Sequence, residues 1–284
     1  MPADQAMLAE VAFSGSARRI GISGPPGAGK SSLIARLAQR WLGDGERVGV
    51  LAIDPTSPLT GGALLGDRVR MDAIADSANL YIRSLSSRSS GDGLCPNICL
   101  LLDAVQQQDF DTIVVETVGV GQVSHQARAL VDTFVVVLVP DSGDTVQAMK
   151  AGIMEVADIY VVNKCELASS QKLAAELRSM ARWRSQREHR VPPVILASAA
   201  ENRGIDELAE AISDHRATML TPAREAELAS ARRDYHLRAL LGQHVDDIID
   251  RNQSNFGDAP LSDCFATIVG QLQTSLRSAM QAAG

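Results

Sequence analysis

The residues with the clearest chemistry form a glycine-rich loop between an apolar stretch and an amphipathic stretch. The loop has the spacing G-x-x-x-x-G-K-[ST], in which glycines let backbone N–H groups surround a polyphosphate, the lysine reaches the β- and γ-phosphates, and the hydroxyl can ligate Mg²⁺. An ordinary glycine turn before a helix is the alternative, but the complete spacing and both flanks favour a nucleoside polyphosphate site. The loop residues are Gly24, Pro25, Pro26, Gly27, Ala28, Gly29, Lys30 and Ser31, with Ser32 behind them.

Two carboxylates are expected near this loop because each follows a buried strand. The run Val48–Ile53 ends at Asp54, and the run Thr112–Val115 ends at Glu116. Open α/β sheets bind ligands at the carboxyl ends of their strands. Asp54 can therefore hold Mg²⁺ directly or through water, although it could also cap the turn before Pro55. Glu116, followed by Gly119 with an N–H that can sense a γ-phosphate, has the arrangement of a hydrolysis-sensing switch.

A third segment indicates which base the nucleotide carries. The apolar run Ile159–Val162 leads into Asn163-Lys164-Cys165-Glu166, close to the N-K-x-D element that recognises guanine. Glu166 replaces the aspartate, and its carboxylate can still accept hydrogen bonds from the N1 and exocyclic amine of guanine, a donor pair that adenine lacks. An ordinary strand-to-helix turn is the alternative. The loop expected to contact the guanine oxygen is Ala197-Ser198-Ala199, and the expected nucleotide-binding residues there are Ser198, Ala199 and Ala200.

Apolar runs that alternate with helical segments predict an α/β fold. Strands as apolar as these are buried on both faces, so we expect a mostly parallel sheet flanked by helices. After residue 220 the strand signals stop, and two helices are expected at about 223–251 and 261–280, separated by 252–257. We therefore predict a nucleotide-binding domain over 1–220 and a helical arm over 221–284. The apolar stripe of the second helix must be covered, either by the chain's own sheet domain or by a second subunit.

Composition excludes several classes of function. The formal net charge is -7, with 27 Lys and Arg against 34 Asp and Glu, so a broad nucleic-acid-binding face is not expected. No apolar run reaches membrane-spanning length and the first residues lack an export signal, so we expect a cytoplasmic protein without a membrane partner. The four cysteines form no paired C-x-x-C set, and packing explains Cys95 and Cys99 better than a metal site.

Three longer blocks resemble the MeaB/MMAA/ArgK family of GTPases. These are residues 51–71, residues 115–122 (Val-Glu-Thr-Val-Gly-Val-Gly-Gln) and the pattern Gly143-Asp144-x-x-Gln147-x-x-Lys150. The similarity covers about residues 18–217. It implies a phosphate-loop GTPase that acts as chaperone of an adenosylcobalamin-dependent acyl-CoA mutase, gating cofactor delivery and protecting or reactivating the mutase. In such a protein adenosylcobalamin belongs to the partner enzyme, and the C-terminal arm joins two subunits.

The resemblance also implies roles for individual residues. Ser31, Asp54, Asp67 and Glu116 correspond to the family's ligands around Mg²⁺ and the attacking water, and Lys30 to its phosphate-loop lysine. Arg70 resembles a candidate cis arginine for the transition state, although a solvated helix residue is the alternative. A third switch that communicates with the mutase contains Asp144, Gln147 and Lys150. GTP hydrolysis is accordingly expected to be slow alone and faster with the mutase.

The sequence departs from the family pattern in three places. Only about seventeen residues precede Arg18, Glu166 changes the guanine-recognition element, and residues 88–97 match a glycine-rich family stretch only in part. These departures suggest a divergent subtype, paired with a mutase for another short branched acyl-CoA. Two rival functions are a nickel-insertion GTPase, for which the five histidines form no ligand cluster with the cysteines, and a phosphate-loop small-molecule kinase, which should not carry Asn163 and Lys164.

Overall fold

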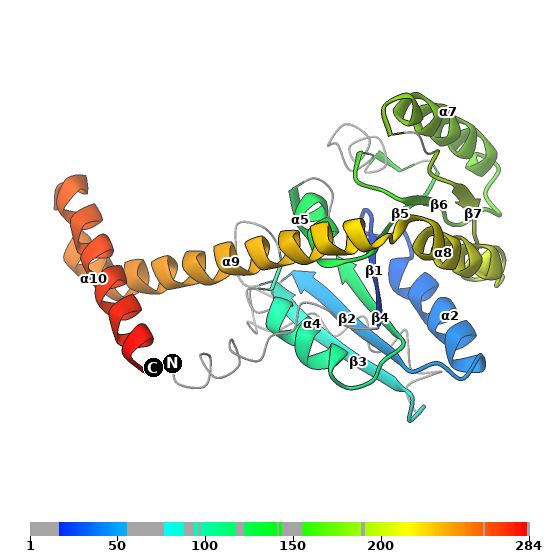
Figure 1. Ribbon diagram of the computed structural model, residues 1–284. Helices are drawn as coiled ribbons and strands as arrows, with labels where there is room; N and C mark the ends of the chain where they lie inside the picture. The colour runs from blue at the N-terminus through cyan, green and yellow to red at the C-terminus, as the bar shows by residue number, and fades with distance from the viewer. Residues whose placement is uncertain are drawn as a thin grey trace. The chain divides into compact units, whose positions relative to one another are not determined.

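The computed structural model describes residues 17–55, 77–87, 94–95, 98–117, 122–140, 142–143, 155–188, 191–257 and 259–282. These residues contain a seven-stranded sheet in which all strand pairs are parallel (Figure 1). The strands lie in the order β3-β2-β4-β1-β5-β6-β7, which confirms the expected sheet. Their bounds are β1 Arg18–Ser23, β2 Val48–Pro55, β3 Leu80–Ser87, β4 Thr112–Thr117, β5 Thr133–Leu138, β6 Ile159–Val162 and β7 Val194–Leu196.

The strands form where the sequence is continuously apolar because both faces of the sheet are covered. Every residue of β4 and β5 is buried, and so is every residue of β1 after Arg18. β1 lies between β4 and β5. The chain leaves β1 toward β2 on one side and later fills the other side with β5, so the strand order reverses at β1. Ligands of open α/β sheets bind at such a reversal, beyond the carboxyl ends of the strands.

Helices cover both faces of this sheet (Figure 1). On one face α2 (Lys30–Gly43) and α8 (Ile205–Met219) share an apolar core with alternate residues of the strands, including Ile20 and Val48. On the other face lie α4 (Ile98–Gln106) and α5 (Gln122–Leu130): a Cβ added to Gly49 would lie 3.3 Å from Val105 of α4. Helix α7 (Ser170–Glu188) packs against β6 and β7.

The chain divides into two compact units, one formed by Ser14–Arg232 and the other containing Arg233–Gly284. Helix α9 (Pro222–Phe256) begins in the first unit and ends in the second, where α10 (Leu261–Ala282) follows. The two C-terminal helices expected from the sequence are therefore present. Residues 252–256, expected to separate them, instead continue α9. The amide of Asn252 explains this, since it donates to the carbonyl oxygen of Ile248 one turn earlier and to Gln271 of α10.

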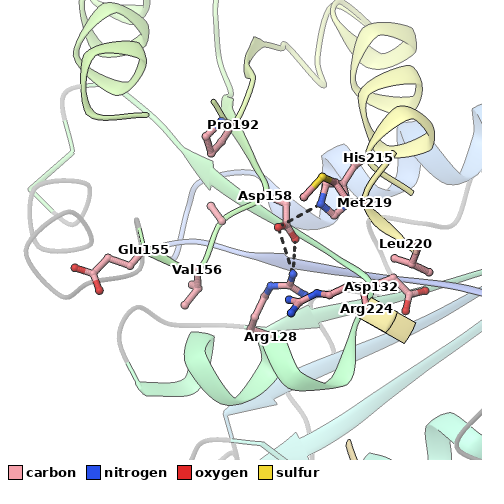
Figure 2. A pocket seen from close by; sticks show the side chains of 11 residues that line it. Arg128, Asp132, Glu155, Val156, Asp158, Pro192, His215, Met219, Leu220 and Arg224 are labelled. Atoms are coloured by element: carbon pink, nitrogen blue, oxygen red, sulfur yellow. Dashed lines mark hydrogen bonds and ion pairs between the residues drawn. The ribbon is translucent and has the colours of Figure 1, made fainter. Parts of the chain in front are cut away.

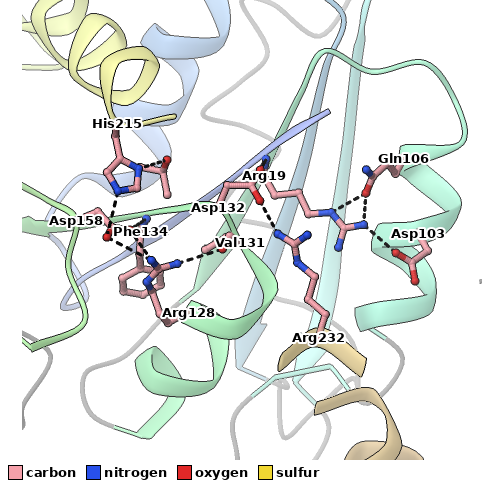
Figure 3. A network of polar contacts seen from close by, with 11 residues as sticks. Arg19, Asp103, Gln106, Arg128, Val131, Asp132, Phe134, Asp158, His215 and Arg232 are labelled. Atoms are coloured by element: carbon pink, nitrogen blue, oxygen red, sulfur yellow. Dashed lines mark hydrogen bonds and ion pairs between the residues drawn. The ribbon is translucent and has the colours of Figure 1, made fainter. Parts of the chain in front are cut away.

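At the amino ends of β5 and β6, two carboxylates hold the sheet to its helices (Figure 3). Asp158 directly precedes β6, and its carboxylate accepts the backbone N–H of Phe134 at 2.8 Å. The same carboxylate lies 3.1 Å from a guanidinium nitrogen of Arg128 and 3.3 Å from Nε2 of His215. Asp132 directly precedes β5 in the same way. We call the two aspartates, together with the charged side chains and the histidine that contact them or one another, the polar floor. Its members are Arg19, Asp103, Arg128, Asp132, Asp158, His215 and Arg232.

Ionised Asp158 is stabilised by its partners in the polar floor. Burial alone would raise the pKa of Asp158, but the hydrogen bond from His215 and the charge of Arg128 bring it below its ordinary value. Because the folded state has the lower pKa, the stabilisation is complete above the unfolded pKa of about 3.9 and is lost as the pH falls below it.

We expect Asp158→Asn to lower the free energy of unfolding at neutral pH by about 3 kcal/mol, because the mutation removes the charge that compensates half-buried Arg128. Urea denaturation followed by circular dichroism measures this. The matched control is Asp44→Asn, whose partner Arg40 is exposed, so that the loss should stay below about 1 kcal/mol. The difference in free energy of unfolding between wild type and Asp158→Asn should become smaller as the pH falls below about 4. Equal losses in the two variants would contradict the stabilising role of Asp158.

Candidate nucleotide-binding site

The phosphate loop keeps its shape through glycines at backbone angles that other residues rarely adopt. Gly24, Gly27 and Gly29 have φ values of 153°, 74° and 79°. A Cβ on Gly24 would lie 2.1 Å from the carbonyl oxygen of Val137 in β5, and one on Gly29 would lie 2.5 Å from the side-chain amide of Asn163. The loop is thus packed closely against β5 and against the residue that follows β6, and only glycine fits at these two contacts.

Lys30 begins helix α2 and points back into the loop. Its Nζ donates to the carbonyl oxygens of Gly24 at 3.0 Å and Pro25 at 3.1 Å. The side chain is buried. The ammonium group therefore lies within the turn of backbone that would surround a polyphosphate, next to the N-terminus of α2, where the helix dipole also favours an anion.

Ser31 and Glu116 meet at the base of the loop. The hydroxyl of Ser31 donates to Oε1 of Glu116 over 3.0 Å, and both residues are buried. Glu116 is held there because β4 pairs with β1 at Ile22 and with β2 at Ala52. A hydroxyl and a carboxylate are hard oxygen ligands, so this donor pair fits the Mg²⁺ that accompanies a nucleotide. Asp54 lies two residues beyond Ala52 in β2, and its side chain is outside the described part of the structure.

Asn163 joins the segment after β6, which is expected to recognise guanine, to the glycine-rich loop. It directly follows β6 and is buried. Its Nδ2 donates to the carbonyl oxygen of Ala28 at 2.8 Å, and its Oδ1 accepts the backbone N–H of Ala199 at 3.3 Å. The loop after β7 is fixed from its other side as well, because Nε of Arg36 in α2 donates to the carbonyl oxygen of Ala199 at 2.9 Å. One amide thus brings together the three segments that the sequence predicted separately.

Glu166 is exposed and Ser198 is buried beneath it. The pKa of Glu166 lies below its ordinary value, chiefly because its own backbone N–H stabilises the carboxylate and secondly because the hydroxyl of Ser198 hydrogen-bonds to it. The hydroxyl of Ser198 also accepts the backbone N–H of Glu201 at 3.2 Å, which fixes its orientation. Lys164 has a positive φ of 58°. These hydrogen bonds favour the ionised form of the Glu166 carboxylate, which can only accept hydrogen bonds.

Several expected site residues lie outside the described part of the chain, namely Asp67, Arg70, Gly119, Asp144, Gln147 and Lys150. Among the residues that are described, no group of three or more His, Cys, Asp or Glu side chains could hold a metal ion. Within that same part of the chain, no helix is long and apolar enough to cross a membrane.

Cys95 precedes α4, whereas Cys99 lies within it and is buried.

Comparison with known proteins identifies the family. Residues 2–256 match the family model described as "Methylmalonyl Co-A mutase-associated GTPase MeaB". The chain belongs to this MeaB family. The resemblance found in the sequence motifs is thereby confirmed, and the match includes the whole of α9 as well as the loops of the candidate site.

Individual members of the MeaB family and a solved structure agree with this assignment. A putative GTPase of Pyrococcus horikoshii is 37% identical over 249 residues, which cover 87% of this chain and 78% of the relative. The mouse protein named methylmalonic aciduria type A homolog, mitochondrial, is 36% identical over 222 residues, covering 77% of this chain and 53% of the mouse protein. The crystal structure of an LAO/AO transport system kinase matches with a TM-score of 0.63 and 26% identity, covering 98% of this chain and 85% of that one.

Sequence reasoning missed the polar floor of this MeaB-family chain. Arg128, Asp158 and His215 line a cavity of about 420 Å³ at the amino ends of β5, β6 and β7, at the opposite edge of the sheet from the phosphate loop (Figure 2). A signal was present, since Asp132 and Asp158 each stand directly before a buried apolar strand. An aspartate directly before a strand is equally typical of a solvated turn, so the pattern by itself does not distinguish a partly buried, ion-paired aspartate from a solvated one.

Proposed function

We propose that this MeaB-family chain binds GTP and GDP with Mg²⁺ and hydrolyses GTP. The observation that carries the proposal is the bridge through Asn163, which holds the loop expected around the phosphates and the loop expected around the base in one rigid arrangement. The names of relatives as GTPases support the same activity. The ionised carboxylate of Glu166 above Ser198 supports guanine as the base.

In this proposal the chain acts mainly by positioning and by charge stabilisation, which dominate phosphoryl transfer. Lys30 turns from the loop carbonyls to the β- and γ-phosphates. Ser31 and Glu116 would hold Mg²⁺, and the ion would supply positive charge that stabilises the phosphates during hydrolysis. Asp54 and Asp67 are proposed to complete the surroundings of the metal and the attacking water, and Arg70 to stabilise the transition state in cis. The arginine role predicts that Arg70→Ala slows hydrolysis.

We further propose that the GTPase serves an adenosylcobalamin-dependent acyl-CoA mutase. It would gate loading of the mutase with its cofactor and protect or reactivate the enzyme, with Asp144, Gln147 and Lys150 in the switch that contacts it. The description of the matching family as mutase-associated supports this role. Isolated GTPases with an incomplete site turn over at about 10⁻⁴ to 10⁻² per second, so the proposal includes slow hydrolysis alone and faster hydrolysis with the mutase.

The partner role is tested by adding the acyl-CoA mutase of the same organism, with and without adenosylcobalamin, to the purified full-length chain. We expect the two proteins to co-elute in gel filtration and the rate of phosphate release from GTP to rise at least about tenfold, because binding would complete the site around the γ-phosphate. If the mutase neither co-elutes nor changes the rate, the partner role is wrong. GTP hydrolysis by the chain alone would still support the GTPase proposal.

The helical arm over 221–284 is proposed to join two subunits. Helix α10 exposes Leu261 to 85% and Phe265 to 67%, and large apolar side chains so exposed favour coverage by another surface. In an isologous dimer the apolar stripe of α10 in each subunit would be covered by the other subunit.

We predict that the full-length chain with GDP is a dimer at micromolar concentration, and that Phe265→Glu makes it a monomer because a charge would be buried in the interface. Light scattering coupled to gel filtration measures the mass. Gln273→Glu, at an exposed position of the same helix, is the control and should remain dimeric. A wild-type monomer would refute the arrangement.

A further inference from the structure

The turn after β7 is closed at its base by a pair of backbone hydrogen bonds. The N–H of Ser198 donates to the carbonyl oxygen of Arg203 at 3.0 Å, and the N–H of Arg203 donates back to Ser198 at 3.1 Å. Residues 199–202 form the turn between them. The closing bonds fix only the two ends of the turn. The placement of Ala199 and Ala200, which are expected beside the base, therefore depends on contacts with other elements.

Ala199 is held from two sides. Its backbone N–H donates to Oδ1 of Asn163 at 3.3 Å, and its carbonyl oxygen accepts Nε of Arg36 at 2.9 Å. The first distance lies just beyond the usual range of an N–H···O bond, whereas the second is typical and its donor is charged, which strengthens it. Arg36 is half-buried on α2, the helix that begins at Lys30. The firmer of the two contacts therefore ties the turn to the helix that follows the glycine-rich loop.

The bond from Arg36 also sets the direction of the next N–H group. The carbonyl of Ala199 and the N–H of Ala200 belong to one planar peptide group, in which the two point in opposite directions when the bond is trans. The peptide bonds of the described residues are trans. Ala200 is exposed, and in the described part of the chain no hydrogen bond uses its N–H. This peptide group therefore presents an N–H donor on the side opposite Arg36.

We propose that Arg36 is a positioning residue for the recognition of guanine, and that it orients the backbone N–H groups of Ala199 and Ala200 toward the 6-oxygen of the base. The inference rests on the proposed binding of GTP and GDP. The N–H of Ala199 leaves its long bond to Asn163 and donates to the base oxygen together with that of Ala200. Arg36 stays on the carbonyl of Ala199 and touches no part of the nucleotide.

Two separate parts of the base are recognised in this arrangement. Glu166 accepts from N1 and the exocyclic amine, whereas the turn donates to the 6-oxygen. Adenine has an amino group in place of that oxygen, so the two N–H donors would face another donor and lose their acceptor. Removing the guanidinium of Arg36 should therefore weaken nucleotides that carry the 6-oxygen more than those that lack it.

The test compares two variants that differ in whether a donor is present. Arg36→Met keeps an unbranched side chain without an N–H, whereas Arg36→Gln places an amide nitrogen as many bonds from the backbone as Nε of arginine. Two analogues accompany GDP. Inosine diphosphate keeps the 6-oxygen but lacks the exocyclic amine, and 6-thio-GDP keeps the amine but has a weakly accepting sulfur in place of the oxygen. Calorimetry with Mg²⁺ on the full-length chain measures each affinity.

In Arg36→Met we expect GDP and inosine diphosphate each to bind about tenfold more weakly, and 6-thio-GDP to lose no more than about twofold, because only the bond to the 6-oxygen is impaired. Arg36→Gln should bind all three within about twofold of wild type. Arg40→Met is the matched control, since Arg40 lies one turn further along α2 and pairs with exposed Asp44 and Asp206. It should bind all three ligands as wild type does.

The positioning role is overturned if Arg36→Met binds GDP as tightly as wild type, or if it loses affinity for all three ligands by the same factor. It is also overturned if Arg36→Gln binds as weakly as Arg36→Met. Circular dichroism checks the fold of each variant, and Arg36→Leu, which also lacks a donor, replaces Arg36→Met if that variant does not fold. Failure of the proposed function is a different result, because wild type itself would then bind neither GDP nor inosine diphosphate.

Discussion

Lys30→Ala should reduce the affinity for GTP and GDP with Mg²⁺ by at least about 100-fold and abolish measurable hydrolysis, because each charge-assisted hydrogen bond to a phosphate contributes about 1.5–3 kcal/mol. The structure adds a second reason. The Nζ of Lys30 already bonds to the carbonyl oxygens of Gly24 and Pro25, so the mutation also removes contacts that shape the loop before a nucleotide arrives. Isothermal calorimetry measures the affinity, and phosphate release measures the rate.

The matched control for this prediction is Lys172→Ala, at an exposed position of helix α7 outside the candidate site. It should bind both nucleotides as wild type does. Circular dichroism of Lys30→Ala should remain that of wild type, since the mutation leaves the strands and helices in place. Nucleotide binding by Lys30→Ala at wild-type affinity would show that the glycine-rich loop does not surround the phosphates.

Glu166→Ala should weaken binding of GTP and GDP by about 100-fold or more while leaving the weak binding of ATP unchanged, because guanine would lose the acceptor of two N–H groups. The pKa of Glu166 is lowered by its own backbone N–H and by Ser198, so the effect should persist throughout neutral pH, where the carboxylate is ionised. Competition calorimetry with ATP and GTP measures the selectivity.

The conservative variant Glu166→Asp tests whether guanine binding needs only a carboxylate at this position or also the longer side chain of glutamate. If the carboxylate recognises guanine, the aspartate should retain most of the selectivity, since aspartate stands at this position in the usual N-K-x-D element. Selectivity that survives in Glu166→Ala would assign guanine recognition to the backbone around Ala199 instead. Asn163 is a poor target for such tests, because its amide also holds the phosphate loop through Ala28.

The strands and the phosphate loop could be predicted from the sequence because each has a local signature. β5 is buried at every position, and a strand with both faces covered must be apolar throughout. The loop requires glycine at Gly24 and Gly29 for reasons of backbone angle and close contact. The segment expected to recognise guanine has an equally local pattern, since Asn163 and Glu166 are three positions apart.

The contacts that join distant segments could not be predicted in the same way. Asp132 and Arg232 are 100 residues apart in sequence, and each alone is typical of a solvated surface. Their pairing depends on where α9 begins to pack on the sheet, which no local pattern specifies. The continuation of α9 through Asn252 was missed for a similar reason, because its amide is satisfied partly by α10. Asparagine and serine locally favour a turn over a helix, so the sequence alone predicts a turn where a side-chain partner on another helix is not apparent.

The strand order also constrains how the chain folds during translation. β1, which leads into the phosphate loop, pairs with β4 and β5 and not with β2, the next strand to be synthesised. The side chains of Arg18 and Thr112, at the start of the β1–β4 pair, bond across 94 positions of sequence. At about 5–20 residues per second on the ribosome, the central strand waits roughly five to twenty seconds for its first neighbour. During that interval its apolar residues are available to chaperones and to aggregation, so mutations that delay β4 should reduce the yield of soluble protein more than their effect on final stability suggests.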